Sequence, residues 1–281
     1  MRTLVTGGTG RVGSRFIPRL VEAGDDVRAL VRAHGRAQQL RAAGAEVVVG
    51  DLRDDGSVRR ALEGIDRVVH LGASFRGGVP EEEAYAVNQL GTEVLGRAAV
   101  RAGVERFVFA STSLAYGPGR GRPAREDDEP DPTSAYPRSK VAAERALATM
   151  EASGGLGLRV IRLAFVYGEQ DDHLAEAPRW ATGWPAHKRL HLLHHADAAA
   201  ALLSALNTDG LDGRTFNAAD DAPLTAVELL TLNGAAVPPE AATRELTDPW
   251  EGILDTTRMR AELGVRLRFP SVYSARDAGA L

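Results

Sequence analysis

Short runs of apolar, β-branched residues alternate with amphipathic stretches through the first half of the chain. Runs of this kind predict buried strands, and the amphipathic stretches between them predict helices. Strands that alternate with helices favour a parallel sheet covered on both faces, a doubly wound α/β fold. The expected strands span residues 2–6, 27–31, 46–50, 67–71, 106–110 and 158–163.

The expected helices follow from a period of 3.6 in the apolar positions. Residues 12–23 place Val12, Phe16 and Leu20 on one face. A long helix is expected near residues 81–102, and another starts near Tyr136. In a parallel sheet, ligands bind at the carboxyl ends of the strands, and the polar motifs described below follow such ends.

Composition then excludes several functional classes. The chain has 281 residues, of which 44% are hydrophobic and 26% charged, with a formal net charge of -4. This balance gives no sign of a nucleic-acid or membrane-surface partner, and no apolar run approaches the roughly 18 residues of a membrane span. The absence of cysteine excludes disulfides and thiolate metal sites. With a glycine-rich turn beginning at Thr6 there is no room for a signal peptide, so we expect a cytoplasmic protein.

The glycine-rich turn predicts a dinucleotide site. Gly7, Gly10 and Gly13 follow the first expected strand and open the first helix. The first glycine permits a sharp turn, the second lets a phosphate approach the backbone, and the third lets the helix pack closely on the sheet. The free N–H groups and partial positive charge of the helix N-terminus then suit a pyrophosphate, which points to a Rossmann-type fold.

The end of the second strand favours NADP over NAD. An acidic residue there would bind the ribose 2′-hydroxyl, but this position holds Val31, followed by Arg32. An arginine can donate charge-assisted hydrogen bonds to a 2′-phosphate, and Arg11 in the glycine turn adds a second cation. Asp51, after the third strand, either accepts a hydrogen bond from the adenine amino group or serves as a helix N-cap.

A tyrosine and a lysine indicate proton transfer. Tyr136 and Lys140 are one helical turn apart, so they can lie on the same face. A nearby ammonium favours the phenolate, so we expect Lys140 to lower the pKa of Tyr136 from its ordinary value near 10. The end of the fifth strand offers three hydroxyls that can hold a developing alkoxide, those of Ser111, Thr112 and Ser113.

Together these motifs resemble an extended short-chain dehydrogenase/reductase of the NAD-dependent epimerase/dehydratase type. The resemblance covers nearly the whole chain, because the motifs follow the family's order as far as a closing helix at residues 255–264. The further motifs are His70-Leu71-Gly72-Ala73, Asn88-x-x-Gly91-Thr92, Ser111 to Gly117, Arg162 to Gly168 and Phe216-Asn217.

The resemblance implies roles for the matching residues. Tyr136 matches the general acid/base, Lys140 matches its partner, and Thr112, four residues before Tyr116, matches the catalytic hydroxyl. With the residues discussed above, the positions expected to bind the dinucleotide are Gly7, Thr9, Gly10, Arg11, Val12, Gly13, Arg32, Asp51, Leu52, Leu71, Gly72, Ala73, Asn88, Ser111, Tyr136, Lys140 and Val166.

The residues expected on the substrate side are Ser113, Phe75, Trp180, Trp184 and His194. The two tryptophans either form an apolar lid over the substrate or pack in the core. Adjacent histidines on a strand point to opposite sides, so His194 and His195 predict no metal site. The resemblance instead places this segment along the substrate cleft.

Two departures from the family's pattern reduce the set of reactions and substrates to be expected. Sugar dehydratases of the family carry Asp-Glu after the catalytic threonine, whereas this chain has Ser113-Leu114, which argues against dehydration. Only about two dozen residues separate Gly168 from His194, where nucleotide-sugar enzymes usually have a longer segment. That segment grips a diphosphate, but here its only cations are Arg179, Lys188 and Arg189.

We therefore expect a Rossmann domain at residues 1–167 and 190–219, with a small, discontinuous C-terminal substrate-binding region at residues 168–189 and 220–281. The favoured function is an NADP-dependent ketoreductase or dehydrogenase that transfers hydride between nicotinamide and the carbonyl or alcohol of a small or secondary-metabolite substrate. The alternatives are a nucleotide-sugar 4-epimerase with tightly bound NAD and a non-catalytic NADP sensor. The resemblance also implies a homodimer, formed through the helices near residues 81–102 and 136–152.

Overall fold

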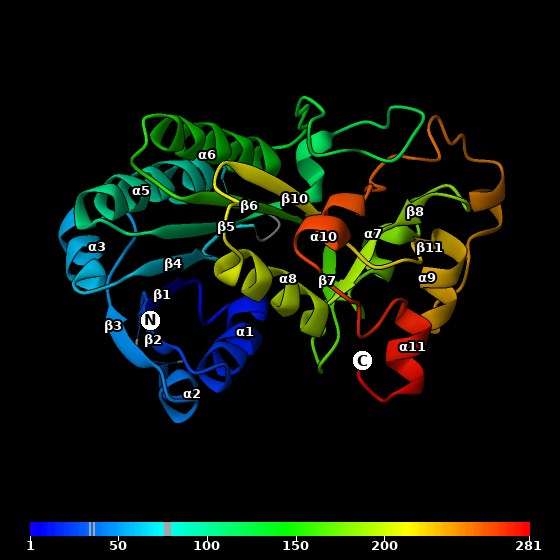
Figure 1. Ribbon diagram of the computed structural model, residues 1–281. Helices are drawn as coiled ribbons and strands as arrows, with labels where there is room; N and C mark the ends of the chain where they lie inside the picture. Colours follow the sequence, from blue (N-terminus) through cyan, green and yellow to red (C-terminus); the bar gives the residue numbers. More distant parts are fainter. Residues whose placement is uncertain (34, 36, 76–79) are drawn as a thin grey trace.

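The computed structural model describes residues 1–33, 35, 37–75 and 80–281, and a seven-stranded parallel sheet organises it (Figure 1). The strand order is β10-β6-β5-β4-β1-β2-β3. Strands β2 and β3 are added on one side of β1 and the later strands on its other side, so the order of strand addition reverses between β1 and β4. This confirms the Rossmann-type doubly wound fold, whose ligand crevice lies at such a reversal. The strands are β1 (Arg2–Thr6), β2 (Asp26–Val31), β3 (Glu46–Val49), β4 (Arg67–His70), β5 (Arg106–Thr112), β6 (Leu158–Leu163) and β10 (Arg214–Ala218).

Helices cover both faces of this sheet and bury two separate cores (Figure 1). On one face lie α1 (Arg11–Glu22), α2 (Ala37–Ala42) and α8 (His195–Asn207). On the other lie α3 (Asp55–Leu62), α5 (Gly91–Ala102) and α6 (Ala135–Ala152). Within the described ranges, every helix is too short or too polar to cross a membrane.

The helix expected near residues 81–102 has three parts. It begins as α4 (Glu81–Tyr85), widens into a π-helical turn, η2 (Ala86–Leu90), and continues as α5. π-helical turns are rare and occur frequently at functional sites. The turn here carries Asn88, one of the expected cofactor residues.

Most of the remaining elements gather beyond the carboxyl end of the sheet around a third core (Figure 1). Strands β7 (Phe165–Tyr167) and β9 (Leu192–His194) pair in parallel, and β8 (Arg189–Leu190) and β11 (Leu224–Thr225) pair antiparallel. The helices here are α7 (Pro178–Ala181), α9 (Ala226–Leu232), η4 (Pro239–Ala242) and α11 (Val272–Asp277). Helix α10 (Thr257–Glu262) instead contacts β10, and its Met259 is buried in the core shared with α1 and α8. The division into two domains at the expected bounds stays a prediction.

The amino end of the sheet is occupied by ion pairs. Five of its strands begin with or near an arginine that pairs with a carboxylate from another segment. These pairs are Arg2 with Glu46, Arg67 with Asp25, Arg106 with Asp209, Arg159 with Asp212 and Arg214 with Glu262. Arg67 and Arg159 are buried, and buried charges need partners of this kind, so their ion pairs satisfy charges at the amino end of the sheet.

One buried carboxyl group has an incomplete set of partners. Asp220 follows β10, and one of its oxygens accepts a hydrogen bond from the Ala222 N–H at 3.2 Å. The other oxygen has no hydrogen-bond partner among the described residues. Burial raises the pKa of Asp220 to about 8, with smaller contributions from Asp221 and Asp197. The group is therefore largely protonated at neutral pH.

This raised pKa predicts a stability that falls between about pH 4 and pH 8. A carboxyl whose folded-state pKa exceeds its unfolded value contributes stability that is fully present below the unfolded pKa and is lost by the time the pH has risen through the folded pKa of about 8. Scanning calorimetry should show that the melting temperature of the parent falls between pH 5 and pH 9. For Asp220→Asn we expect this fall to be smaller by a few degrees. The exposed Asp209→Asn serves as control and should follow the parent. An equal fall for parent and Asp220→Asn would contradict the assignment.

Candidate active site

The glycine turn has the geometry that a dinucleotide needs. Gly7 has φ +72°, and a Cβ there would lie 2.5 Å from the Gly72 nitrogen. A Cβ on Gly13 would lie 2.3 Å from the Gly7 carbonyl oxygen, so neither glycine can be replaced without moving the turn. Among the described residues, α1 has no side-chain cap and no acidic residue in its first turn. Its first N–H groups therefore fit a pyrophosphate.

Arg11 does not offer a free cation to the cofactor. Its guanidinium pairs with Asp171, and with Glu176 at 3.2 Å. His195 Nε2 lies 2.8 Å from the other Asp171 oxygen. Burial alone would raise the pKa of Asp171, but the hydrogen bonds with His195 and Arg11 hold it well below its usual range. The carboxylates of Asp171 and Glu176 thus compensate the positive charge of Arg11, which was expected to help Arg32 bind a 2′-phosphate.

The adenosine end of the expected site keeps one exposed cation. Val31 ends β2 as a buried residue, and Arg32 follows it exposed to solvent. Arg32 has no ion pair with any described residue. Asp51 is held by Arg53 through both carboxylate oxygens, at 3.0 and 2.7 Å. These hydrogen bonds lower the pKa of Asp51 to about 2, with a smaller contribution from Arg32.

A buried chain of hydrogen bonds joins the end of β1, the end of β4 and the π-helical turn that carries Asn88. His70 Nε2 lies 2.8 Å from Thr92 Oγ1, whose hydroxyl donates to the Asn88 carbonyl at 2.6 Å. Thr92 must therefore accept from His70, which leaves His70 Nδ1 to accept from Thr6 Oγ1 at 2.5 Å. Thr6 Oγ1 in turn accepts from the Gly72 N–H at 3.3 Å. Burial lowers the pKa of His70 well below its usual range, so the ring is neutral.

The Asn88 side chain ties the loop after β4 to helix α6. Its oxygen accepts from the Ser74 N–H at 2.7 Å, and its nitrogen donates to the Ser74 carbonyl and to Ser139 Oγ, both at 2.9 Å. Ser139 Oγ donates to the Tyr136 carbonyl at 2.8 Å. Both N–H donors of Asn88 are used within the protein, so Asn88 positions the first turn of α6.

The structure brings Tyr136, Lys140 and Thr112 together. Tyr136 lies in the first turn of α6, and its hydroxyl is hydrogen-bonded to the Thr112 side chain at the end of β5. Thr112 Oγ1 accepts from the Leu114 N–H at 3.2 Å in the short helix η3 (Ser113–Tyr116). Its own proton is therefore available to Tyr136 or to a substrate oxygen. Lys140 is only 1% exposed, with Nζ 3.9 Å from the centre of the Phe109 ring.

The pKa values in this turn differ from the expectation. Burial raises the pKa of Tyr136 to about 12, and the hydrogen bond with Thr112 offsets only part of that rise. Burial also lowers the pKa of Lys140 to about 7, although Glu144 opposes this. Lys140 is thus only partly charged at neutral pH. The expected lowering of the Tyr136 pKa by Lys140 is not seen, because desolvation dominates both groups.

Ser111, near this turn, is one of the residues expected to bind the cofactor. It is buried, and its Oγ has no hydrogen-bond partner among the described residues. An orphaned donor of this kind is costly unless a ligand satisfies it, which fits a bound dinucleotide. Val166 lies in the centre of β7, and its carbonyl accepts from His173 Nδ1 at 3.0 Å. Leu52 and Leu71 are partly buried and pack against the two cores of the sheet.

The expected substrate residues differ in their surroundings. The Phe75 ring lies 5.7 Å from the Tyr136 ring and is 48% exposed. Trp180 and Trp184 contact each other at 4.6 Å and are partly buried against the third core. His194 is fully buried, with Nδ1 accepting from the Ala196 N–H and Nε2 donating to the Ala280 carbonyl. His194 therefore has no polar atom left for a substrate, because it caps helix α8.

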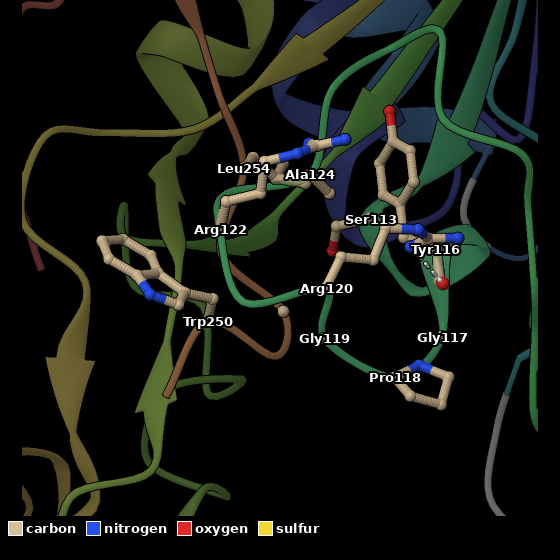
Figure 2. Close-up of a pocket in the computed structure, with 11 residues that line it drawn as sticks. Ser113, Tyr116, Gly117, Pro118, Gly119, Arg120, Arg122, Ala124, Trp250 and Leu254 are labelled. Atoms are coloured by element: carbon tan, nitrogen blue, oxygen red, sulfur yellow. Dashed lines mark hydrogen bonds between the residues drawn. The ribbon is translucent and has the colours of Figure 1, made fainter. Parts of the chain in front are cut away.

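Ser113 faces a small pocket beside the catalytic turn (Figure 2). The pocket lies between the loop at residues 117–124 and Trp250, and Arg120 and Arg122 line it. Arg120 donates to the Tyr116 carbonyl at 3.0 Å, and Arg122 pairs with Asp128. No group of three or more His, Asp or Glu side chains in the described ranges could hold a metal ion.

Sequence reasoning missed His173, and it included Phe165 only as part of the Arg162 to Gly168 motif. The His173 ring stacks on the Phe165 ring with centroids 3.9 Å apart, and it also lies 6.2 Å from Phe75. Both residues flank the Tyr167-Gly168 turn, which was the only local signal that could have drawn attention to them. Burial lowers the pKa of His173, which favours a neutral ring.

Comparison with known proteins agrees with this geometry. The chain matches the model of the NAD dependent epimerase/dehydratase family over residues 3–219 and belongs to that family. It is therefore an NAD(P)-dependent enzyme of the short-chain dehydrogenase/reductase superfamily.

Individual relatives carry different activities. A Stigmatella aurantiaca protein, 4-hydroxy-2-methyl-3-oxo-4-farnesyl-3,4-dihydroquinoline-1-oxide ketoreductase, is 32% identical over 83% of this chain and 72% of its own length. A UDP-glucose 4-epimerase from Streptomyces lividans is 39% identical, over 55% of this chain and 49% of its own length. A short-chain dehydrogenase/reductase superfamily protein from Agrobacterium tumefaciens with bound NAD superposes with a TM-score of 0.80, at 25% identity, covering 99% of this chain and 96% of that one.

The buried ammonium predicts a conflict between stability and function. A lysine whose pKa is lowered to about 7 destabilises the fold most below pH 7, and this cost shrinks as the pH rises toward 10. We expect Lys140→Met to raise the melting temperature by a few degrees at pH 6 and by less at pH 9, while abolishing activity. Lys188→Met, which removes a lysine paired with Glu251 at 2.9 Å, is the control and should give no gain. A lower melting temperature for Lys140→Met at pH 6 would contradict this account.

Proposed function

We propose that the chain is an NADP-dependent ketoreductase that acts on the carbonyl group of a small or secondary-metabolite substrate. The observation that carries this proposal is the convergence of Tyr136, Lys140 and Thr112 in a desolvated turn at the carboxyl end of β5. Ser113-Leu114 follows Thr112, so no acid/base pair is available there for dehydration. An expected cytoplasmic location and a homodimer through α5 and α6 belong to the same proposal.

When bound, a nicotinamide cofactor would supply or accept the hydride. The residues of the chain then handle the oxygen of the substrate. The Thr112 hydroxyl donates to the carbonyl oxygen and holds it beside Tyr136. Tyr136 passes its proton to that oxygen as negative charge develops, acting as the general acid. Lys140 lies one helical turn after Tyr136, and its donors suit the ribose hydroxyls of the cofactor.

The charge around the substrate side supports a ketoreductase over the alternative nucleotide-sugar epimerase. Three cations lie between Gly168 and His194, and the protein engages two of them. Lys188 pairs with Glu251 and Arg189 donates to the Pro249 carbonyl, whereas Arg179 is 79% exposed and lies 3.9 Å from Glu176. A diphosphate would therefore find one uncompensated cation in this segment. The name of the Stigmatella aurantiaca relative, a ketoreductase for a dihydroquinoline, agrees with this choice.

Exposed Arg32 after buried Val31 supports NADP as the cofactor. A guanidinium without a carboxylate partner can bind a 2′-phosphate, and no acidic side chain stands at the end of β2 to repel one. NAD remains the alternative.

The proposed activity requires a tyrosine-dependent consumption of NADPH. We expect stoichiometric oxidation of NADPH with at least one ketone in a panel, measured at 340 nm with product identified by chromatography. Tyr136→Phe keeps the ring but removes the proton, so its kcat should fall by about a hundredfold or more. Tyr273→Phe is the matched control and should retain the parental rate. Interconversion of UDP-glucose and UDP-galactose without added NADPH would establish the epimerase instead, and NADPH binding without turnover of any substrate would favour the sensor.

The cofactor assignment predicts a selective loss of NADPH affinity. Arg32→Ala should weaken NADPH binding about tenfold, because a charge-assisted hydrogen bond is lost, and should leave NADH binding nearly unchanged. Fluorescence titration with both cofactors measures the two dissociation constants. Arg59→Ala, an exposed arginine of α3, is the control. Equal losses for both cofactors would overturn the assignment of Arg32 to the 2′-phosphate.

A further inference from the structure

Six aromatic side chains form a continuous row that begins at the catalytic tyrosine. Phe75 lies 5.7 Å from Tyr136 and 6.2 Å from His173, measured between ring centroids. The row continues from His173 to Phe165 at 3.9 Å, from Phe165 to Trp180 at 6.0 Å and from Trp180 to Trp184 at 4.6 Å. We call these residues the aromatic row: Tyr136, Phe75, His173, Phe165, Trp180 and Trp184.

The exposure of the row distinguishes it from ordinary core packing. The phenylalanines of the sheet, such as Phe107 and Phe216, are fully buried. Phe75 is instead 48% exposed, and Phe165, His173, Trp180 and Trp184 are each partly exposed. Phe165, Trp180 and Trp184 pack against the third core, which holds them in place from behind. Pre-positioned apolar rings with an open surface are what a ligand site for an apolar molecule requires.

The row carries few polar groups. His173 Nδ1 donates to the Val166 carbonyl, so the ring presents Nε2 as an acceptor, which has no hydrogen-bond partner among the described residues. The indole N–H groups of Trp180 and Trp184 likewise have no hydrogen-bond partner among the described residues and can donate. The Lys188 ammonium lies 5.1 Å from the Trp184 ring and pairs with Glu251, and the Lys140 ammonium is buried over the Phe109 ring. The row therefore offers mainly apolar ring surface, with the His173 acceptor as the hydrogen-bonding group closest to Phe75.

We propose that the aromatic row binds the flat, aromatic body of the ketone substrate, which places the carbonyl at Tyr136 and Thr112 and a hydrogen-bond donor of the substrate at His173. This proposal rests on the proposed ketoreductase function and names its substrate class. Ring pairs in offset or edge-to-face contact favour an aromatic ligand over a saturated one of the same size. A diphosphate would set negative charge against the ring faces, which themselves carry partial negative charge.

A binding experiment tests the substrate class without turnover. The probes are 1-tetralone and its saturated analogue 1-decalone, which share one bicyclic skeleton and one ketone. Isothermal titration calorimetry on Tyr136→Phe saturated with NADP⁺ should show 1-tetralone binding about two- to tenfold more tightly than 1-decalone. Trp180→Leu and Phe165→Leu should remove this preference. Tyr273→Leu, which alters another partly buried ring of the same core, should keep it.

The outcomes separate this proposal from the proposed function. Equal affinities for the two ketones, or a preference that survives both Trp180→Leu and Phe165→Leu, would overturn the aromatic row as a binding surface. NADPH-dependent reduction of ketones in the parent would then still establish the ketoreductase. A tetralone preference that the row variants abolish, in a protein that reduces no ketone, would support the row and overturn the proposed function. Melting temperatures of the variants show whether each one folds.

Discussion

The desolvated first turn of helix α6 is the constraint on which the site depends. Lys140 is buried against the Phe109 ring, and Tyr136 is held next to Thr112 in surroundings that disfavour its ionisation. Neither arrangement is favourable in itself, because burying an ammonium destabilises the fold and a tyrosine with a pKa near 12 is a weak acid at neutral pH. The surrounding fold must therefore hold the turn in place.

Two chains of hydrogen bonds keep this turn in place, and both include Asn88. Asn88 joins the loop after β4 to Ser139, which holds the Tyr136 carbonyl. His70 joins β1 to α5 through Thr6 and Thr92. The π-helical turn at Ala86–Leu90 places Asn88 where it can reach both of its partners. The glycine turn and the catalytic turn are thereby fixed relative to each other.

The sequence predicted the parts of the site that depend on local pattern. The six strands expected from apolar runs are present, with their ends shifted by two residues at most, and Tyr136, Lys140 and Thr112 converge as their spacing indicated. Partners distant in the sequence were beyond such reasoning. His194 is a helix cap because Ala280 lies against it, and Arg11 is neutralised by Asp171. Phe75, Trp180 and Trp184 were expected near the substrate, but their continuity through His173 and Phe165 was not, because the contacts of the aromatic row join three separate segments of the chain.

The central claim is that burial keeps Tyr136 protonated in the protein without cofactor. A direct test is ultraviolet difference titration of phenolate absorbance, comparing the parent with Tyr136→Phe so that the other four of the five tyrosines cancel. Without cofactor, the account predicts no Tyr136 phenolate up to pH 10, in line with a pKa of about 12. With NADP⁺ bound, the positive nicotinamide should bring that phenolate into view below pH 10. A Tyr136 that titrates near pH 10 without cofactor, or a titration that NADP⁺ leaves unchanged, would contradict the account.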